Sequence, residues 1–288
     1  MNVGAASSNL IQRPDWTIDQ GWGNYTSENH AVWKMLFDRQ VEQLAGRACD
    51  EFVAGMNALP LGREQIPDFD LLSQVLVRNT GWQIVAVPGL VPDDVFFDHL
   101  AHRRFPAGNF IRDRSQLDYL EEPDVFHDVF GHVPMLMNPV FADYVQAYGI
   151  AAQRAREVGA LDKLASMYWF TVEFGLVRQA DGLKIYGAGI ASSYTESLFA
   201  LDDDSPNRIK FDLMRVMRTT KRIDDFQETY FVIDDLAELF AFVDCVTLDT
   251  FYRQITALPT IDPSERVYGD HILHRGSGRY HEGKKGYP

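Results

Sequence analysis

Hydrophobic residues recur at intervals of three and four along most of the chain, and this periodicity predicts a helix-rich protein. The longest pattern begins at a capping residue, Thr26 or Ser27, and continues to about Met56. Further helices are expected over residues 71–78, 93–103, 139–158, 161–179, 193–200, 208–218 and 235–256. Together with a few short strands, these helices indicate a predominantly helical α+β fold.

Short strands and turns are expected between the helices. Residues 82–87 alternate in hydrophobicity up to Pro88-Gly89, which is typical of a strand that ends in a turn. We also expect a turn at residues 105–108, a short strand and loop over residues 109–120, and a short strand at residues 185–186.

The distribution of hydrophobic residues predicts one large domain with two polar ends. Residues 1–25 form an N-terminal extension, residues 26–257 carry the periodic pattern, and residues 258–288 are rich in Gly, Lys and Arg and predict a loose C-terminal tail. The N-terminus lacks the apolar stretch of a secretory signal, and no run of about 18 apolar residues predicts a membrane helix. We therefore expect a cytoplasmic protein that does not contact membranes.

Charge and cysteine content argue against two further classes of protein. The 288-residue chain carries a net charge of −14, which opposes binding to nucleic acid. It has only two cysteines, Cys49 and Cys245, so a disulfide framework is excluded. Both cysteines lie in apolar helical patterns and are expected to be buried, unreactive thiols in a reducing compartment.

A carboxylate on an apolar helical stripe is the first candidate for a functional residue. Glu173 lies in the segment LASMYWFTVEFGLV, with Trp169, Leu176 and Val177 as its helical neighbours. A buried charge without a partner costs several kcal/mol, so Glu173 needs a cation or should be neutral. That cation is either an arginine from elsewhere in the chain or a metal ion.

Two histidines favour the metal ion. His127 and His132 lie in the segment PDVFHDVFGHVP, where apolar neighbours indicate that both side chains point inward. Their i, i+5 spacing places them about 140° apart on a regular helix, which is a poorer arrangement than i, i+4. Gly131 and Pro134 indicate that the helix ends or distorts at this point, which would allow the two imidazoles to converge.

Two histidines and one carboxylate leave open coordination positions on a metal. This donor set is typical of non-haem iron(II) oxygenases and of hydrolytic zinc sites, and the residue types leave both open. A zinc hydrolase is expected to carry a glutamate base, as in an HExxH motif, and the chain has none. Asp128, beside the first histidine, is either an outer acceptor for a ligand imidazole or a solvated helix residue.

Two non-oxygenase alternatives have weaker support. Residues 187–192, GAGIAS, loosely resemble a dinucleotide-binding loop, but a third glycine and an alternating βαβ run are missing. A non-catalytic binding protein would require a closed metal site, whereas three ligands indicate an open one.

Three segments resemble the motifs of a known family. PDVFHDVFGHVP, YWFTVEFGL and YGAGIASSYTE resemble those of the pterin-dependent aromatic amino acid hydroxylases, and the match looks closest to the bacterial, single-domain phenylalanine hydroxylases. The resemblance runs from about residue 25 to about residue 245. It implies one catalytic domain with a central iron cleft, in which His127, His132 and Glu173 hold a catalytic iron(II).

The resemblance also implies which residues bind the amino acid. Arg112, in NFIRDRSQLDYLEEPD, falls on the arginine that holds the substrate carboxylate, although the residues alone are equally consistent with a surface ion pair to Asp113. Trp169 and Phe174 fall on the aromatic pocket, and Ser192 falls near the substrate backbone.

The pterin segment of the family falls on VPGLVPDDVFF. There Phe96 is expected to stack on the flat pterin ring, while the backbone around Gly89 and Val91 meets its edge. Animal members carry Thr-Pro-Glu-Pro before the first histidine motif, where this chain has residues 120–123, LEEP. The chain also lacks an N-terminal regulatory domain and a long C-terminal coiled coil, so we expect a monomer that is not activated by its substrate.

The reaction implied by the resemblance is hydroxylation of phenylalanine to tyrosine, with dioxygen and a tetrahydropterin as cosubstrates of iron(II). The alternatives within the family are hydroxylation of tyrosine or tryptophan. The position that is acidic in tyrosine hydroxylases falls on Ile223, which offers a substrate hydroxyl no partner. Trp169 matches the phenylalanine and tyrosine branches better than the tryptophan branch, so phenylalanine satisfies both observations.

Overall fold

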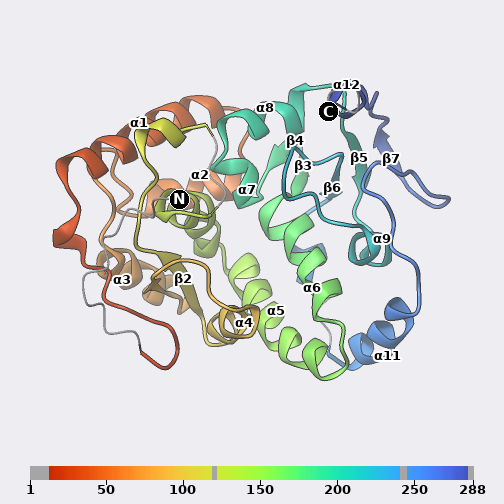
Figure 1. Ribbon diagram of the computed structural model, residues 1–288, viewed down its shortest axis with the longest axis horizontal. Helices are drawn as coiled ribbons and strands as arrows, with labels where there is room; N and C mark the ends of the chain where they lie inside the picture. The colour runs from red at the N-terminus through yellow and green to blue at the C-terminus, as the bar shows by residue number, and fades with distance from the viewer. Residues whose placement is uncertain (1–12, 119–121, 241–244, 285–288) are drawn as a thin grey trace.

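Helices surround two small sheets in the fold shown in Figure 1. The computed structural model describes residues 13–118, 122–240 and 245–284, and the side chains of residues 240–249 lie outside that description. The expected α+β class, predominantly helical, is confirmed by the order of its elements. The α-helices are α1 (Ser27–Leu44), α2 (Asp50–Ala58), α3 (Phe69–Thr80), α4 (Asp93–Ala101), α5 (Pro139–Glu157), α6 (Leu161–Tyr168), α7 (Ala188–Ala191), α8 (Tyr194–Asp202), α9 (Leu213–Arg218), α10 (Leu236–Phe240), α11 (Cys245–Thr256) and α12 (Arg279–Lys284).

Tighter and wider helical turns join several of these elements. The 3-10 helices are η1 (Trp22–Asn24), η2 (Arg114–Gln116) and η4 (Val133–Met137). Two further segments, η3 (Phe126–His132) and η5 (Trp169–Glu173), are π-helices. Each π-helix carries residues that the sequence singled out for metal binding, so the irregular turns coincide with the expected site.

The larger sheet has five strands in the order β4-β3-β6-β5-β7, and it lies on the side of the molecule opposite α3 and α4 (Figure 1). Its strands are β3 (Leu176–Gln179), β4 (Gly182–Ile185), β5 (Asn207–Lys210), β6 (Thr229–Ile233) and β7 (Ile272–His274). The central β6 runs parallel to both β3 and β5, whereas β4 and β7 pair antiparallel at the two edges. All five residues of β6 are buried, as expected for a central strand.

The smaller sheet corrects one expectation. Residues 105–108 were expected to form a turn, but they belong to β2 (Arg104–Gly108), which pairs parallel with β1 (Gln83–Val87). Pro106 has no backbone N–H, and a two-stranded sheet tolerates it because each strand leaves one edge without a partner. Residues 109–118, in contrast, contain η2 rather than the expected strand.

The long N-terminal helix is divided in two. The sequence predicted one helix to about Met56, but α1 ends at Leu44 and α2 begins at Asp50. Between them Gly46 has a φ of 74°, which is the left-handed region that favours glycine, and Ala48 forms a parallel bridge to Ile185. The bridge to β4 interrupts a hydrophobic stripe that by itself is compatible with a continuous helix.

Two other expected helices contain strands. Of residues 161–179, α6 and η5 end at Glu173 and β3 follows, and of residues 208–218 only α9 is helical, because β5 takes the first part. Both strands are only four residues long and mix apolar with polar residues, LVRQ in β3 and NRIK in β5, so hydrophobic periodicity does not separate them from a helix. Pairing with β6 decides their conformation.

The described parts of the two ends pack on the domain. Ile18 is buried and its N–H donates to the carbonyl oxygen of Ala86, so the extension wraps at this point rather than fraying. The last residues were expected to be loose, but β7 pairs with β5 and α12 buries His281. These contacts use backbone hydrogen bonds and a few isolated side chains, Ile18, Tyr280 and His281, which leave little hydrophobic periodicity in the sequence.

One face of α5 is buried in the hydrophobic core. Tyr144 and Tyr148 of α5 are fully buried, and α4 packs so closely that a Cβ atom at Gly149 would lie 2.4 Å from the backbone nitrogen of Ala101. The expectation of a buried thiol is confirmed for Cys49, whose pKa burial raises to about 12. The side chain of Cys245 lies outside the described residues.

Candidate metal centre

The two histidines converge because they lie on a π-helix. His127 and His132 are five residues apart on η3, and the wider π turn brings such residues toward the same side, where a regular helix would separate them. Gly131 allows the neighbouring α7 to approach, since a Cβ atom there would lie 2.9 Å from the carbonyl oxygen of Ala188. The distortion suspected from Gly131 and Pro134 is therefore a local change of helix type.

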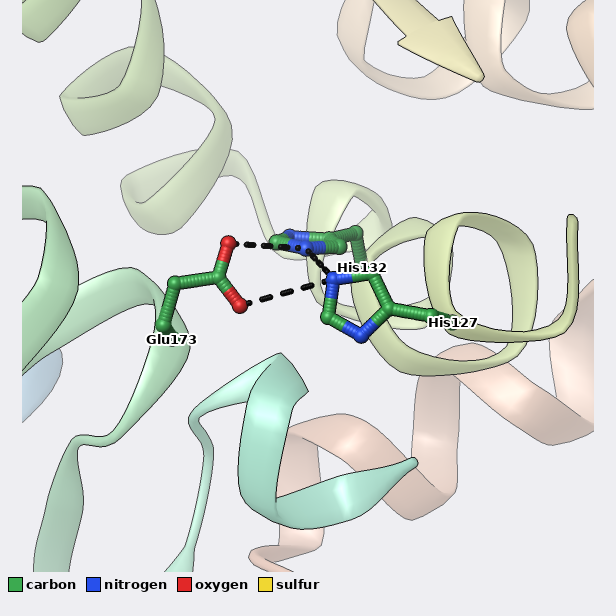
Figure 2. A group of neighbouring side chains, drawn as sticks. All are labelled: His127, His132 and Glu173. Atoms are coloured by element: carbon green, nitrogen blue, oxygen red, sulfur yellow. Dashed lines mark hydrogen bonds and ion pairs between the residues drawn. The ribbon is translucent and has the colours of Figure 1, made fainter. Parts of the chain in front are cut away.

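Glu173 faces the histidines from the end of η5. Figure 2 shows its carboxylate directed at both imidazoles, which come from the opposite side of the site. Nε2 of His132 lies 3.2 Å from Oε1 of Glu173 and 3.1 Å from Nε2 of His127. Nε2 of His127 lies 3.6 Å from the other carboxylate oxygen. The three residues thus place one donor atom each around a common point.

Glycines around Glu173 create the room for this arrangement. A Cβ atom at Gly187 would lie 2.4 Å from the carbonyl oxygen of Glu173, and one at Gly189 would lie 2.9 Å from the ring of Phe174. The GAGIAS segment therefore packs α7 against the metal-site helices. This contact, rather than phosphate binding, accounts for its glycines.

Burial acts on the charges of His127 and Glu173. Burial lowers the pKa of His127 to about 4, and the neighbouring His132 acts in the same direction. Burial also opposes charge on Glu173, but the two imidazoles outweigh this and hold its pKa below the usual value. The site therefore presents an anionic carboxylate and a neutral His127 imidazole at neutral pH, which are the protonation states that metal coordination requires.

Ser192 fixes the tautomer of His127. Its hydroxyl donates to the carbonyl oxygen of Ala188 at 2.8 Å, and a hydroxyl has only one proton to donate. At its 2.9 Å contact with Nδ1 of His127, Ser192 must therefore accept the Nδ1–H. The lone pair of His127 then lies on Nε2, on the side of His132 and Glu173. From the sequence, Ser192 was expected near the substrate. In the structure it contacts His127, a candidate metal ligand.

The donor set and spacing fit one divalent transition-metal ion. Ligand atoms at about 2.1 Å from an ion and at right angles to one another lie roughly 3 Å apart, which is close to the observed separations. Two imidazoles and one carboxylate on one side leave the remaining positions open, the arrangement typical of non-haem iron(II) oxygenases. Within the described part of the chain, this is the one group of three such donors.

Asp128 has a different partner from the one expected. Its side chain is buried and accepts the backbone N–H of Gly108 at 2.7 Å, so it ties β2 to η3. Burial raises the pKa of Asp128 to about 7, although the Gly108 hydrogen bond opposes the rise. No hydrogen bond to a ligand imidazole accompanies it among the described residues.

Arg112 is buried rather than paired with Asp113 on the surface. Its Nε and Nη2 groups donate to the two carboxylate oxygens of Asp124 at 2.9 and 2.8 Å. Asp124 also accepts the backbone N–H of His127 at 3.1 Å, which ties the ion pair to the start of η3. Both side-chain bonds use one edge of the guanidinium, so in the described structure Nη1 remains for another acceptor. Sequence reasoning missed Asp124, although an acidic residue just before a helix is a signal for such a role.

The aromatic residues expected at the site lie on two sides of it. Trp169 and Phe174 are half-buried, and their rings contact each other in a tilted arrangement with centroids 4.7 Å apart, at the two ends of the π turn that carries Glu173. Phe96, on α4, is half-buried and contacts Tyr168 edge-on at 5.5 Å. Tyr168 stacks on His132 at 6.4 Å and was not singled out from the sequence.

The loop expected to meet the pterin edge is held by a glutamate. The backbone N–H of Leu90 donates to Glu122 at 3.1 Å, and a Cβ atom at Gly89 would lie 2.3 Å from the same carboxylate oxygen. Gly89 and Val91 thus lie on a loop joined to the chain just before η3. Glu122 was not recognised from the sequence as a partner of this loop.

Ile223 does not occupy the position that the specificity argument assumed. Its side chain is 74% exposed, so it forms no buried wall against a substrate hydroxyl. The sequence-based preference for phenylalanine over tyrosine therefore has no support from Ile223.

Comparisons with known proteins agree with this site. Residues 22–249 match the family of biopterin-dependent aromatic amino acid hydroxylases. The chain belongs to this family. It is 61% identical over 271 residues to the phenylalanine-4-hydroxylase of Caulobacter vibrioides, covering 93% of this chain and 91% of that protein. It is 58% identical over 226 residues to the enzyme of the same name from Chromobacterium violaceum, covering 78% of this chain and 76% of that protein.

Solved structures show the same architecture. The Chromobacterium violaceum phenylalanine hydroxylase with bound Fe(III) matches with a TM-score of 0.88 at 51% identity, covering 90% of this chain and 94% of that chain. Its iron- and phenylalanine-bound form matches with a TM-score of 0.85 at 49% identity and the same coverage. Family membership makes this chain a pterin-dependent, iron-binding hydroxylase, and the zinc hydrolase and dinucleotide alternatives fall away. None of the described helices is both long and apolar enough to span a bilayer.

Proposed function

We propose that the chain hydroxylates L-phenylalanine to L-tyrosine, with dioxygen and a tetrahydropterin as cosubstrates, at an iron(II) ion held by His127, His132 and Glu173. The observation that carries the proposal is the convergence of these three donors, within 4.8 Å of one another, from two π-helices. Relatives that are 61% and 58% identical bear the name phenylalanine-4-hydroxylase, and this supports phenylalanine over tyrosine or tryptophan as the substrate.

The bound iron, with electrons from the pterin, supplies the activation of dioxygen. The chain supplies orientation and a dry environment. Ser192 accepts the Nδ1–H of His127 and donates to Ala188, which keeps Nε2 of His127 free to coordinate. Phe105 packs against the His132 ring at 4.9 Å, and Tyr168 stacks on it, so the ligand lies in apolar surroundings that exclude water.

The amino acid substrate is held at both of its ends. The free Nη1 edge of Arg112 binds the substrate carboxylate, while Asp124 keeps the guanidinium in place through its other edge. The aromatic pair of Trp169 and Phe174 holds the phenyl ring. Both parts are attached directly to helices that carry metal ligands, so the substrate ring and the metal share one rigid frame.

The pterin lies on the other side of the site, between Phe96 and the loop around Gly89 and Val91. Phe96 offers a half-buried ring face, and the loop offers backbone groups held in position by Glu122. Within the proposal one catalytic domain, residues 26–257, works as a cytoplasmic monomer. A reduced, buried Cys49 is consistent with that compartment.

Reconstitution tests the proposal. Iron-free protein is loaded anaerobically with iron(II), supplied with phenylalanine and a tetrahydropterin, and exposed to air. We expect tyrosine in the iron-loaded sample and none in samples loaded with zinc, which has no redox chemistry. Tyrosine and tryptophan are offered as competing substrates in the same assay. Equal or faster turnover of either one would overturn the substrate assignment, and tyrosine formation with zinc would overturn the oxygenase assignment.

A further inference from the structure

The indole of Trp169 has a hydrogen-bond partner that lies outside the metal site. Its Nε1–H donates to Oε1 of Gln227 at 3.0 Å. Gln227 is 1% exposed and lies in the segment just before β6, far from Trp169 in sequence. A buried indole N–H needs an acceptor, and an acceptor on one side of the ring selects one orientation of the ring.

The amide of Gln227 is itself held in one orientation. Its Nε2 group donates to the carbonyl oxygen of Arg222 at 2.8 Å, and a carbonyl can only accept. The NH₂ end must therefore face Arg222, which leaves the oxygen facing the indole. The backbone N–H of Gln227 donates to the buried carboxyl group of Glu196 at 3.3 Å. Both the side chain and the backbone of Gln227 are thus anchored.

This contact links substrate orientation to the metal ligands. Trp169 begins η5 and Glu173 ends it, and the N–H of Phe174 closes the π turn on the carbonyl oxygen of Trp169 at 2.9 Å. The rings of Trp169 and Phe174 contact each other with centroids 4.7 Å apart and planes tilted by 40°. Rotation of the indole would change this contact and therefore the shape of the aromatic pocket next to Glu173.

We infer that Gln227 is a positioning residue for the hydroxylation, because it holds the indole of Trp169 in the orientation that receives the substrate ring. The inference rests on the proposed function, since it takes Trp169 as part of the substrate pocket. Gln227 acts through Trp169 and contacts neither the iron ligands nor the pterin segment among its described hydrogen bonds.

The test replaces Gln227 by methionine, which has a similar shape and no strong acceptor. Loss of one neutral hydrogen bond of this kind corresponds to about a three- to tenfold change in equilibrium. We expect Gln227→Met to raise the KM for phenylalanine by about three- to tenfold. The KM for the tetrahydropterin and the iron content are expected to stay at wild-type values. An unchanged KM for phenylalanine would overturn the inference.

A double-mutant cycle separates positioning from a general structural role. Phenylalanine at position 169 has no N–H, so Gln227→Met is expected to change the KM for phenylalanine by less than about twofold in a Trp169→Phe background. Equal fold-changes in both backgrounds would mean that Gln227 does not act through the indole. The matched control is Gln20→Met, which loses bonds to Pro67 and Phe69 away from the site and is expected to leave the KM unchanged.

Gln227→Glu is the second test variant, for use if Gln227→Met folds poorly. It retains an oxygen for the indole N–H but loses the bond to Arg222. We expect reduced thermal stability with a KM for phenylalanine within about twofold of wild type, whereas a purely structural role makes KM follow stability. A wild-type enzyme that forms no tyrosine overturns the proposed function itself. An active wild type with unchanged KM in Gln227→Met overturns this inference alone.

Discussion

Asp124 is a fully buried carboxylate and Glu173 a largely buried one beside the same histidine, yet their partners are opposite in kind. Asp124 is 0% exposed and accepts four hydrogen bonds, three from Arg112 and one from the backbone of His127. Burial alone would raise its pKa, but the bonds and charge of Arg112 outweigh it and lower the pKa. Asp124 therefore has a complete set of donors and a permanent cation.

Glu173 has no such set. Its partners are two imidazole nitrogens, and burial holds His127 neutral above a pH of about 4. Among the described residues, the His127 imidazole and the Glu173 carboxylate thus meet at one point without a permanent cation between them. A carboxylate whose donors are complete, such as Asp124, holds the fold in place, whereas a carboxylate beside an unprotonated imidazole indicates a site that a metal completes.

The largest expected effect comes from the metal cluster. His127→Ala, His132→Ala and Glu173→Gln should each reduce tyrosine formation to background and reduce bound iron, because a three-ligand site has no spare protein ligand. The iron-free form of Glu173→Gln should lose little stability relative to iron-free wild type, because the partners of the carboxylate are two imidazoles rather than a permanent cation. Iron content, tyrosine formation and urea unfolding in chelator measure this. A variant with wild-type iron content and turnover would show that its residue is not a ligand.

Substitution of Asp124 should cause a much larger loss of stability than substitution of Glu173. Asp124→Ala leaves Arg112 buried without its partner, and breaking a buried ion pair from one side costs about 3–5 kcal/mol of unfolding free energy. Urea unfolding of the iron-free protein gives this loss directly, next to the Glu173→Gln result. A loss below about 1 kcal/mol would place the pair with ordinary surface ion pairs and remove the contrast between the two carboxylates.

The Arg112–Asp124 ion pair can also be tested for a role in binding the substrate carboxylate. If its free edge binds the amino acid carboxylate, Arg112→Lys should cost about 2–5 kcal/mol in kcat/KM for phenylalanine, because a lysine cannot bridge Asp124 and the substrate in the same geometry. On phenethylamine, which has no carboxylate, the loss should be small. Similar losses on both compounds would mean that the pair supports only the fold or the iron site.

Glu196 is a third buried carboxyl, and among the described residues it forms no ion pair with a cation. Burial raises its pKa to about 7, although hydrogen bonds from Tyr230 and Gln227 oppose the rise, and the charge of Asp225 adds to it. Between its usual pKa of 4.5 and about 7, the folded state holds a proton that the unfolded state has lost, so stability falls as pH rises through this window. The total amounts to roughly 3 kcal/mol.

Glu196→Gln removes this pH dependence, because the amide resembles the protonated acid. The variant should gain stability relative to wild type as the pH rises from 5 to 8, by about 3 kcal/mol in urea unfolding of the iron-free proteins. Glu64→Gln, at an exposed carboxylate paired with Lys34, is the matched control and should show no such gain. Parallel pH curves for wild type and Glu196→Gln would mean that Glu196 is ionised in the folded protein.

Much of the candidate site could be predicted because it lies in short, continuous segments. His127, His132 and Glu173 each follow from local patterns of polar residues among apolar neighbours, and the structure brings the three together. What the spacing could not predict is how the histidines converge. On a regular helix they diverge, and the π form of η3 is chosen by packing against α7 rather than by any local propensity.

Residues that act through distant partners could not be predicted. Gln227, Glu196 and Asp124 are ordinary polar residues in sequence, and their roles depend on neighbours 12 to 58 positions away along the chain. Ile223 illustrates the reverse case, because the resemblance to the family implied a role beside the substrate, whereas its side chain is exposed.

The sequence by itself determined the helix-rich class, the likeness to the aromatic amino acid hydroxylases and the three donor residues, because each depends on local periodicity or on contiguous motifs. Only the tertiary structure decided that residues 104–108 and 207–210 are strands and that residues 272–274 join the sheet. Strand formation requires a partner from elsewhere in the chain, and a run of three to five residues does not specify that partner. The same reason applies to the ion pair of Arg112 with Asp124 and to the bond between Trp169 and Gln227, whose partners meet only when the chain has folded.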